Sequence, residues 1–197
     1  MIKRLLATTA LLASVACTSA FAAETDPDWP CAQQLVPKIA AAQLWTSGDL
    51  PDENAAMTAP PELSDLGRSV MDSRIADDKV VKMLKDHFAK VKDHKKLNAE
   101  IPTLFIVALT EANSQRQRQI SGIKDFTRGQ FTLSKKMADD VNELDKLTAG
   151  QPAKDGTPEK AIEDREHQVK YLCEAPSGGE ARLGLVARTL EGAMGKK

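Results

Sequence analysis

The sequence predicts an all-α protein, an elongated bundle of five or six helices around one long, kinked helix, with one disulfide bond. Three observations lead to this fold class. Apolar residues recur every three or four positions through most of the chain, which is the period of one helix face. The alternating pattern typical of strands is nearly absent. Two cysteines lie near opposite ends of the chain, where they can join the start of the fold to a late helix.

The start of the chain has the three parts of an export signal. Lys3 and Arg4 form a short positive region, and an apolar stretch runs from Leu5 to Ala16. Ala20-Phe21-Ala22 then matches a cleavage site, so the mature protein would begin at Ala23. The apolar stretch is shorter than the roughly 20 residues that span a bilayer, and no later segment reaches that length. We therefore expect a cleaved signal peptide and no integral membrane span after its removal.

We divide the chain into a signal peptide (1–22), an extended leader rich in proline and polar residues (23–36) and a single helical domain (37–197). The periplasm is the expected location, with full secretion as one alternative. A lipoprotein anchored through Cys17 is another, although such signals usually have Leu three residues before the cysteine, where this chain has Ser14. The 175 residues that follow the signal suit one domain.

The mature chain is almost balanced in charge. The whole sequence has 27 basic and 28 acidic residues, and the signal removes Lys3 and Arg4, which leaves a net charge of −3. Nucleic-acid binding needs a clear basic excess, so we expect no nucleic-acid partner. A composition that is 42% hydrophobic and 28% charged fits a folded protein rather than a disordered one.

Cys31 and Cys173 remain once the signal is removed. Two cysteines in an oxidising compartment are expected to pair, and this pair would enclose 142 residues. Loop-closure entropy sets an upper guide of about 5 kcal/mol for the stabilisation from so long a loop. The alternatives are two unpaired thiols or pairing with another chain.

Three shorter helices are predicted before the long one. The first opens at Pro37, whose missing N–H would be unpaired at that position anyway, and stops at Gly48 and Pro51. Residues 49–61 are interpreted as a loop. The apolar positions of the next two helices step by three or four: Leu63, Leu66 and Val70 in a helix over about 62–75, then Val80, Leu84, Phe88 and Val91.

The segment 99–149 is the most informative part of the chain because its apolar residues mostly keep a helical spacing. One helix over these 51 residues would be about 75 Å long, whereas a compact chain of this size is about 40 Å wide. The helix must therefore project or break. We favour one long helix kinked at Gly122 and Gly129, and the alternative is two shorter helices parted near Gly129.

Two helices are predicted after a loop at 150–156. Thr157 and Pro158 form an N-cap and a first helical position, and Pro176 should end the helix that they begin. Ser177 and Glu180 match a capping box, which indicates that a separate last helix starts there.

The sequence carries none of the common catalytic or cofactor motifs that we sought. It has no G-x-S-x-G turn, P-loop, dinucleotide-binding glycine pattern, H-E-x-x-H or C-x-x-C. Covalent c-type haem needs C-x-x-C-H, which is also absent. We therefore predict a protein that is not an enzyme and that uses no cofactor.

The three histidines do not predict a metal site. His87 and His94 lie seven residues apart on what the pattern indicates is one charged helix, about 10.5 Å along its axis, which is too far to share an ion. We expect both at exposed or flanking positions. His167 follows Asp164 at a spacing suited to a metal, but a di-iron bundle needs two such pairs and two further glutamates.

A polar run, residues 113–119, interrupts the apolar face of the long helix. Extending that face from Phe105 and Ala112 towards Ile120 places Arg116 on the core-facing line. An isolated buried charge costs several kcal/mol, so we expect Arg116 to pair with an acidic residue of a neighbouring helix. The alternatives are an anion or ligand site at the guanidinium, and an exposed Arg116 on a helix whose apolar face drifts.

These features together favour an exported, non-enzymatic protein that acts through protein–protein contacts. Such a protein would be an accessory, adaptor or chaperone-like factor of the bacterial envelope. Long exposed helical faces are surfaces for coiled-coil or helix-in-groove contacts. The alternative function is a periplasmic protein that binds a small molecule or ion between helices near Arg116.

Overall fold

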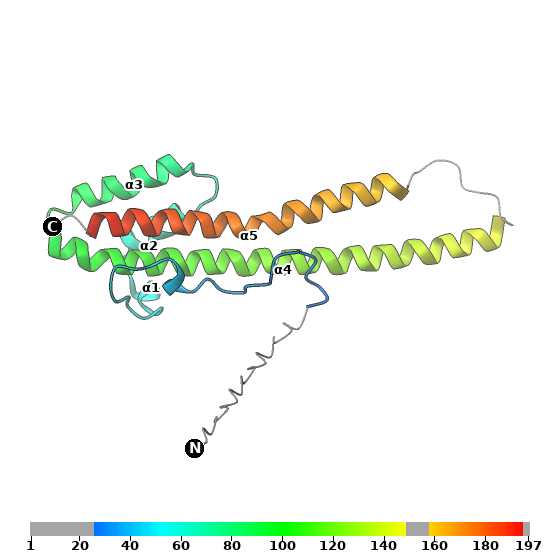
Figure 1. Cartoon of the computed structure of the whole chain (residues 1–197), viewed down its shortest axis with the longest axis horizontal. Helices are drawn as coiled ribbons and strands as arrows, with labels where there is room; N and C mark the ends of the chain where they lie inside the picture. The colour runs from blue at the N-terminus through cyan, green and yellow to red at the C-terminus, as the bar shows by residue number, and fades with distance from the viewer. Residues whose placement is uncertain (1–25, 149–157, 195–197) are drawn as a thin grey trace, which may run out of the picture.

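The structure is a computed structural model that describes residues 26–148 and 158–194. These residues form five α-helices and no strand: α1 (Ala55–Thr58), α2 (Pro61–Val70), α3 (Asp77–Lys90), α4 (His94–Thr148) and α5 (Pro158–Met194). Figure 1 shows α4 and α5 side by side along the long axis of the molecule, with α1, α2 and α3 gathered at one end. The predicted all-α class, the single long helix and the disulfide are confirmed.

The long helix α4 is continuous over 55 residues, about 80 Å, so the alternative of two helices parted near Gly129 is wrong. It begins at His94 rather than near residue 99. The carboxylate of Asp93 accepts the N–H groups of Lys95 and Lys96 at 2.8 and 3.4 Å, which caps the first turn. Pro102 consequently lies inside the helix and not in its first turn.

The prediction that Pro176 ends a helix is wrong, because α5 continues through it to Met194. Proline has no N–H to donate, so the carbonyl of Leu172 loses its helical partner. Pro176 is buried, its own carbonyl accepts a hydrogen bond from Arg116 of α4, and the amide of Gln33 donates to the carbonyl of Cys173. These contacts and the packing of α5 on α4 compensate the local cost of the proline, and no new helix starts at Ser177.

The molecule consists of two parts along its long axis, which we call the body and the arm. The body consists of α1, α2 and α3, residues 94–128 of α4, residues 173–194 of α5 and the N-terminal segment. All the buried hydrophobic residues of the described chain belong to it, and Phe105 lies fully buried at its centre. The arm consists of residues 129–148 of α4 and 158–172 of α5, and it continues past the ends of the shorter helices (Figure 1).

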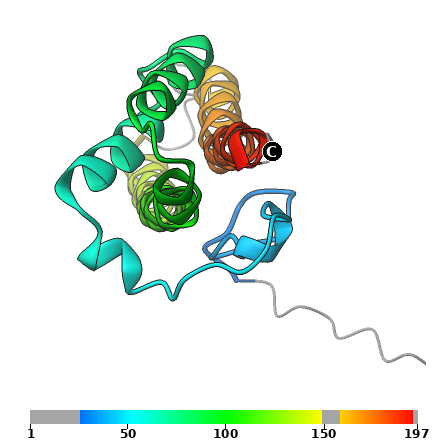
Figure 2. The same cartoon turned by 90° about the vertical axis from the view of Figure 1, so that its left-hand side faces the viewer.

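The two faces of the α4–α5 pair are covered differently in the body. On one face α2 packs against α4 and α3 against α5, which makes a four-helix cluster. On the opposite face lies the N-terminal segment, which is mostly extended (Figure 2). We call residues 26–54 the strap.

The strap contains only one 3₁₀ turn, Ala41–Gln43, so the prediction of a helix opening at Pro37 is wrong. From Val36 to Ile39 its backbone groups bond to side chains of α4, as described below. Trp45 anchors its far end, since this side chain is buried and its ring centroid lies 4.8 Å from that of Phe105. The extended leader predicted to end at residue 36 thus continues into the segment that was expected to be helical.

Gly67 marks the closest approach of α2 to α4. A Cβ added there would lie 2.8 Å from Cβ of Val107 and would also overlap its Cγ1. We therefore expect Gly67→Ala to lower the free energy of unfolding by about 1–3 kcal/mol. Gly129→Ala, which has open space around it within α4, should raise this free energy by about 0.5–1 kcal/mol. Urea unfolding of both variants tests the packing, and a loss of stability at Gly129 alone would contradict it.

Candidate functional site at the strap junction and the arm

The polar run of α4 is a row of side chains that bind the backbone of non-helical segments. Asn113, Arg116 and Gln117 bond to backbone groups of the strap. Gln115 donates to the carbonyl of Met71, at the end of α2, at 3.2 Å. The interruption of the apolar face therefore supplies partners for backbone groups that no helix or sheet satisfies.

The side chain of Asn113 hydrogen-bonds to the backbone of the strap as a neighbouring β-strand would. Its side-chain oxygen accepts the N–H of Ile39 at 2.8 Å, and its side-chain nitrogen donates to the carbonyl of the same residue at 3.2 Å. Both residues are buried, and a buried peptide group without partners would cost about 1–3 kcal/mol for each unpaired atom. One amide thus satisfies a whole peptide residue at the centre of the body.

Arg116 is buried, with 9% of its surface exposed, and lies between the strap and α5. Nε donates to the carbonyl of Val36 at 2.6 Å, and Nη1 donates to the carbonyl of Pro176 at 3.4 Å. Nη1 also lies 3.4 Å from a carboxylate oxygen of Glu180 on α5, which is the kind of interhelical ion pair that the sequence suggested. The guanidinium therefore joins three segments that are distant in sequence.

The disulfide and two ion pairs fasten the beginning of the strap. Cys31 and Cys173 are bonded, with their Cα atoms 5.6 Å apart, as predicted. Asp26 pairs with Lys124 at 2.6 Å, and Asp28 pairs with Arg128 at 3.2 Å. The hydrogen bond from the Lys124 ammonium holds the pKa of the Asp26 carboxyl below its usual range.

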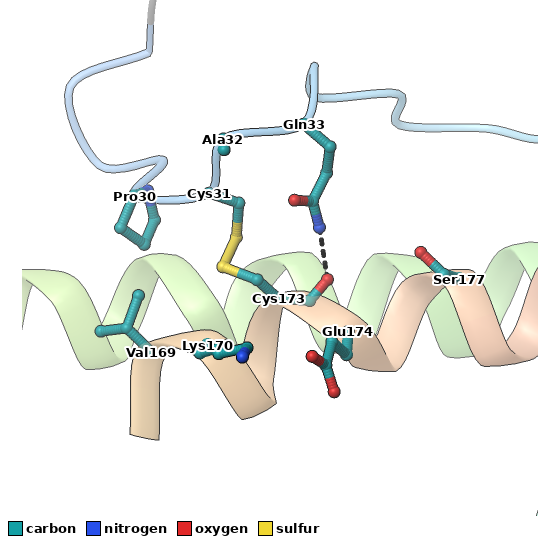
Figure 3. A pocket seen from close by; sticks show the side chains of 9 residues that line it. All are labelled: Pro30, Cys31, Ala32, Gln33, Val169, Lys170, Cys173, Glu174 and Ser177. Carbon is teal, nitrogen blue, oxygen red and sulfur yellow. Dashed lines mark hydrogen bonds between the residues drawn. A yellow bond between two sulfur atoms is a disulfide. The ribbon is translucent and has the colours of Figure 1, made fainter. Parts of the chain in front are cut away.

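A cleft of about 580 Å³ opens beside the disulfide, where the strap meets α5 (Figure 3). Pro30, Val169 and the two bonded cysteines give it apolar walls, and Lys170 is among its polar lining residues. Its size falls in the range of small-molecule sites. Arg116 does not line this cleft, and its hydrogen bonds go to protein oxygens.

The expectation that His87 is exposed or flanking on a helix shared with His94 is wrong, because His87 is buried and lies on α3 whereas His94 begins α4. The side chain of His87 faces Glu62 of α2, with Nδ1 and the carboxylate 3.9 Å apart, and Glu100 of α4, with Nε2 and the carboxylate 3.5 Å apart. Among the residues that the structure describes, no group of three or more His, Cys, Asp or Glu side chains could hold a metal ion. His167 is exposed on α5, and Asp164 lies outside the residues whose side chains are described.

Most of the exposed large apolar side chains of the described residues lie on the arm. Six large hydrophobic residues of the described chain are exposed, and four of them belong to the arm: Phe131, Leu133, Met137 and Tyr171. Phe131 exposes 75% of its surface and Tyr171 exposes 76%. No arm side chain that the structure describes is buried. None of the described helices is long and apolar enough to cross a membrane.

Comparisons with protein-family models, with characterised proteins and with solved structures find no match to this chain. Sequence reasoning placed Arg116 and the two cysteines in its candidate site but did not foresee the roles of Asn113 and Gln117. The signal for those roles is an amide-rich run on an otherwise apolar helix face.

Replacing Arg116 tests its part in joining the strap to α5. We expect Arg116→Met to lower the free energy of unfolding by about 2–3 kcal/mol, because two backbone carbonyls lose a charged donor. Glu180→Gln should cost less than about 1 kcal/mol, since the Glu180 side chain is 49% exposed. Urea unfolding with the disulfide intact measures both. Equal losses for the two variants would show that the ion pair, and not the bonds to the backbone, carries the effect.

Proposed function

We propose that this protein is an exported, non-enzymatic factor of the bacterial envelope that acts through protein–protein contacts made by its helical arm. The role is that of an accessory, adaptor or chaperone-like protein. One observation carries the proposal: four of the six exposed large hydrophobic side chains lie on the arm, away from the buried core. Soluble proteins rarely gather apolar side chains on a projection unless another surface covers them.

The architecture supports different roles for the two parts of the molecule: the body holds the fold together, and the arm makes contacts. The body contains the buried core, the strap and the disulfide, so it can fold as a unit. The arm extends the same two helices outward, and no third helix among residues 26–148 and 158–194 lies on them (Figure 1). A helix pair with exposed apolar residues is suited to helix-to-helix contacts of the coiled-coil kind.

The predicted signal peptide and the disulfide both support export to the periplasm. Residues 1–22 lie outside the described residues, so the export proposal depends on their sequence pattern. Disulfide bonds form and persist in oxidising compartments, and this one encloses 142 residues. Mature protein recovered from the periplasm should begin at Ala23.

The alternative function, a ligand or ion site at Arg116, has less support from the contacts. The guanidinium donates to two protein carbonyls and lies beside Glu180, so a bound anion would have to displace these partners. Arg116 is also buried and does not line the cleft beside the disulfide.

Site-specific photo-crosslinking in the native host tests the proposed function. A photoreactive residue at Phe131 should give a discrete product with another envelope protein, because this side chain is exposed on the arm. The same residue placed at Lys79, which is exposed on α3 of the body, is the matched control and should give none. Mass spectrometry of the products identifies the partner. If Phe131 yields only uncrosslinked protein, or if Lys79 yields the same product, the arm is not the contact surface.

A further inference from the structure

His87 lies where three helices of the body meet. It belongs to the last turn of α3, and its side chain is 9% exposed. Nδ1 faces the carboxylate of Glu62 in the first turn of α2, and Nε2 faces the carboxylate of Glu100 in the second turn of α4. One imidazole therefore lies between two carboxylates, and each carboxylate belongs to a different helix.

The two contacts differ in burial. Nε2 of His87 and Oε2 of Glu100 are both buried, and neither atom has a hydrogen-bond partner among the residues that the structure describes. Buried polar atoms are nearly always paired, so two of them that lie 3.5 Å apart call for a proton between them. The Glu62 side chain is 77% exposed, so its carboxylate is also open to water.

The number of protons on the imidazole decides how many of these carboxylates it can bind. A neutral imidazole has one N–H group, and its other nitrogen is an acceptor. With the proton on Nε2, the lone pair of Nδ1 faces Glu62, and with the proton on Nδ1, the lone pair of Nε2 faces Glu100. Only the imidazolium offers a donor to each carboxylate, and such charge-assisted hydrogen bonds are the stronger kind.

The other charged groups near His87 leave the site short of one positive charge. Lys96 of α4 pairs with the second oxygen of Glu100 at 3.6 Å, and its side chain is 66% exposed. Arg188 of α5 lines a cleft on another side of α3, which His87 does not line. No acidic group of α5 within the described range 158–194 lies at ion-pair distance from His87. Two carboxylates thus face one ammonium until the imidazole takes up a proton.

We propose that His87 is a proton-operated clasp, in which protonation of the imidazole binds α3 to α2 through Glu62 and to α4 through Glu100. Proton uptake then stabilises the folded protein relative to the unfolded chain, in which the three side chains are apart. An unfolded histidine takes up its proton near pH 6.5, so the added stability is present below that pH and is lost at higher pH. The clasp goes beyond the proposed function and does not depend on the arm.

Urea unfolding of the mature protein, residues 23–197 with the disulfide formed, tests the clasp at about pH 8 and about pH 5.5. The comparison variant is His87→Gln, whose side chain is polar and takes up no proton. Relative to this variant, the folded-to-unfolded equilibrium constant of the wild type should rise about tenfold between the higher and the lower pH. His94→Gln is the matched control, because His94 is exposed at the start of α4, and it should keep the pH profile of the wild type.

Glu62→Gln provides a second variant, because this side chain is exposed and the change removes only its charge. The tenfold rise should shrink to about threefold, since the imidazolium keeps Glu100 alone. If His87→Gln does not unfold cooperatively, the pH profile of Glu62→Gln decides the question. An unchanged profile in this variant, or the same rise in His87→Gln as in the wild type, would overturn the clasp.

Nitrogen NMR of the His87 ring gives a direct readout in the folded wild type. At about pH 7, where an unfolded histidine is mostly neutral, both ring nitrogens should carry a proton in most molecules. A His87 ring that is mostly neutral at this pH would contradict the proposal. The exposed ring of His94 serves as the internal reference in the same spectrum.

Discussion

The structure depends on the polar run in the middle of α4, which binds the backbone of a segment that forms no helix. Asn113, Arg116 and Gln117 provide hydrogen-bonding partners for backbone groups of residues 36–39, which would otherwise remain unpaired against the core. With the strap in place, Trp45 reaches Phe105 and closes one side of the body. The disulfide and the ion pair between Asp28 and Arg128 hold the start of the same segment. Removing the polar run would leave the apolar face continuous but would leave residues 36–39 of the strap without their partners on α4.

This arrangement separates a closed part of the molecule from an open part. In the body, both faces of the α4–α5 pair are covered, one by α2 and α3 and the other by the strap. In the arm, the same two helices continue with exposed Phe131, Leu133 and Tyr171. The hydrophobic core lies in the body, so the fold does not require the apolar residues of the arm to be buried. Interaction through the arm is therefore compatible with a body that is folded before any partner arrives.

The sequence predicted what local periodicity and residue type determine. The spacing of apolar residues indicated the long helix, and the two remaining cysteines indicated the disulfide. The strap was missed because Pro37 suits a first helical position, whereas the partners of its neighbours lie more than 70 residues away on α4. The sequence predicts a helix end at Pro176 because the local penalty of a proline, about 3 kcal/mol, is visible in the sequence and the long packing of α5 is not. The sequence predicts an exposed or flanking His87 because its neighbours along the chain are charged, whereas the helices that face it, α2 and α4, meet it only through tertiary contacts.

Amide hydrogen exchange at Ile39 tests most directly whether the polar run holds the strap. This N–H lies outside any helix, and its acceptor is the side chain of Asn113. The account predicts slow exchange in the wild type, and exchange at least about tenfold faster in Asn113→Ala with the disulfide intact, because a bond worth more than about 1.4 kcal/mol is lost. Fast exchange at Ile39 in the wild type, or slow exchange that persists in Asn113→Ala, would contradict it.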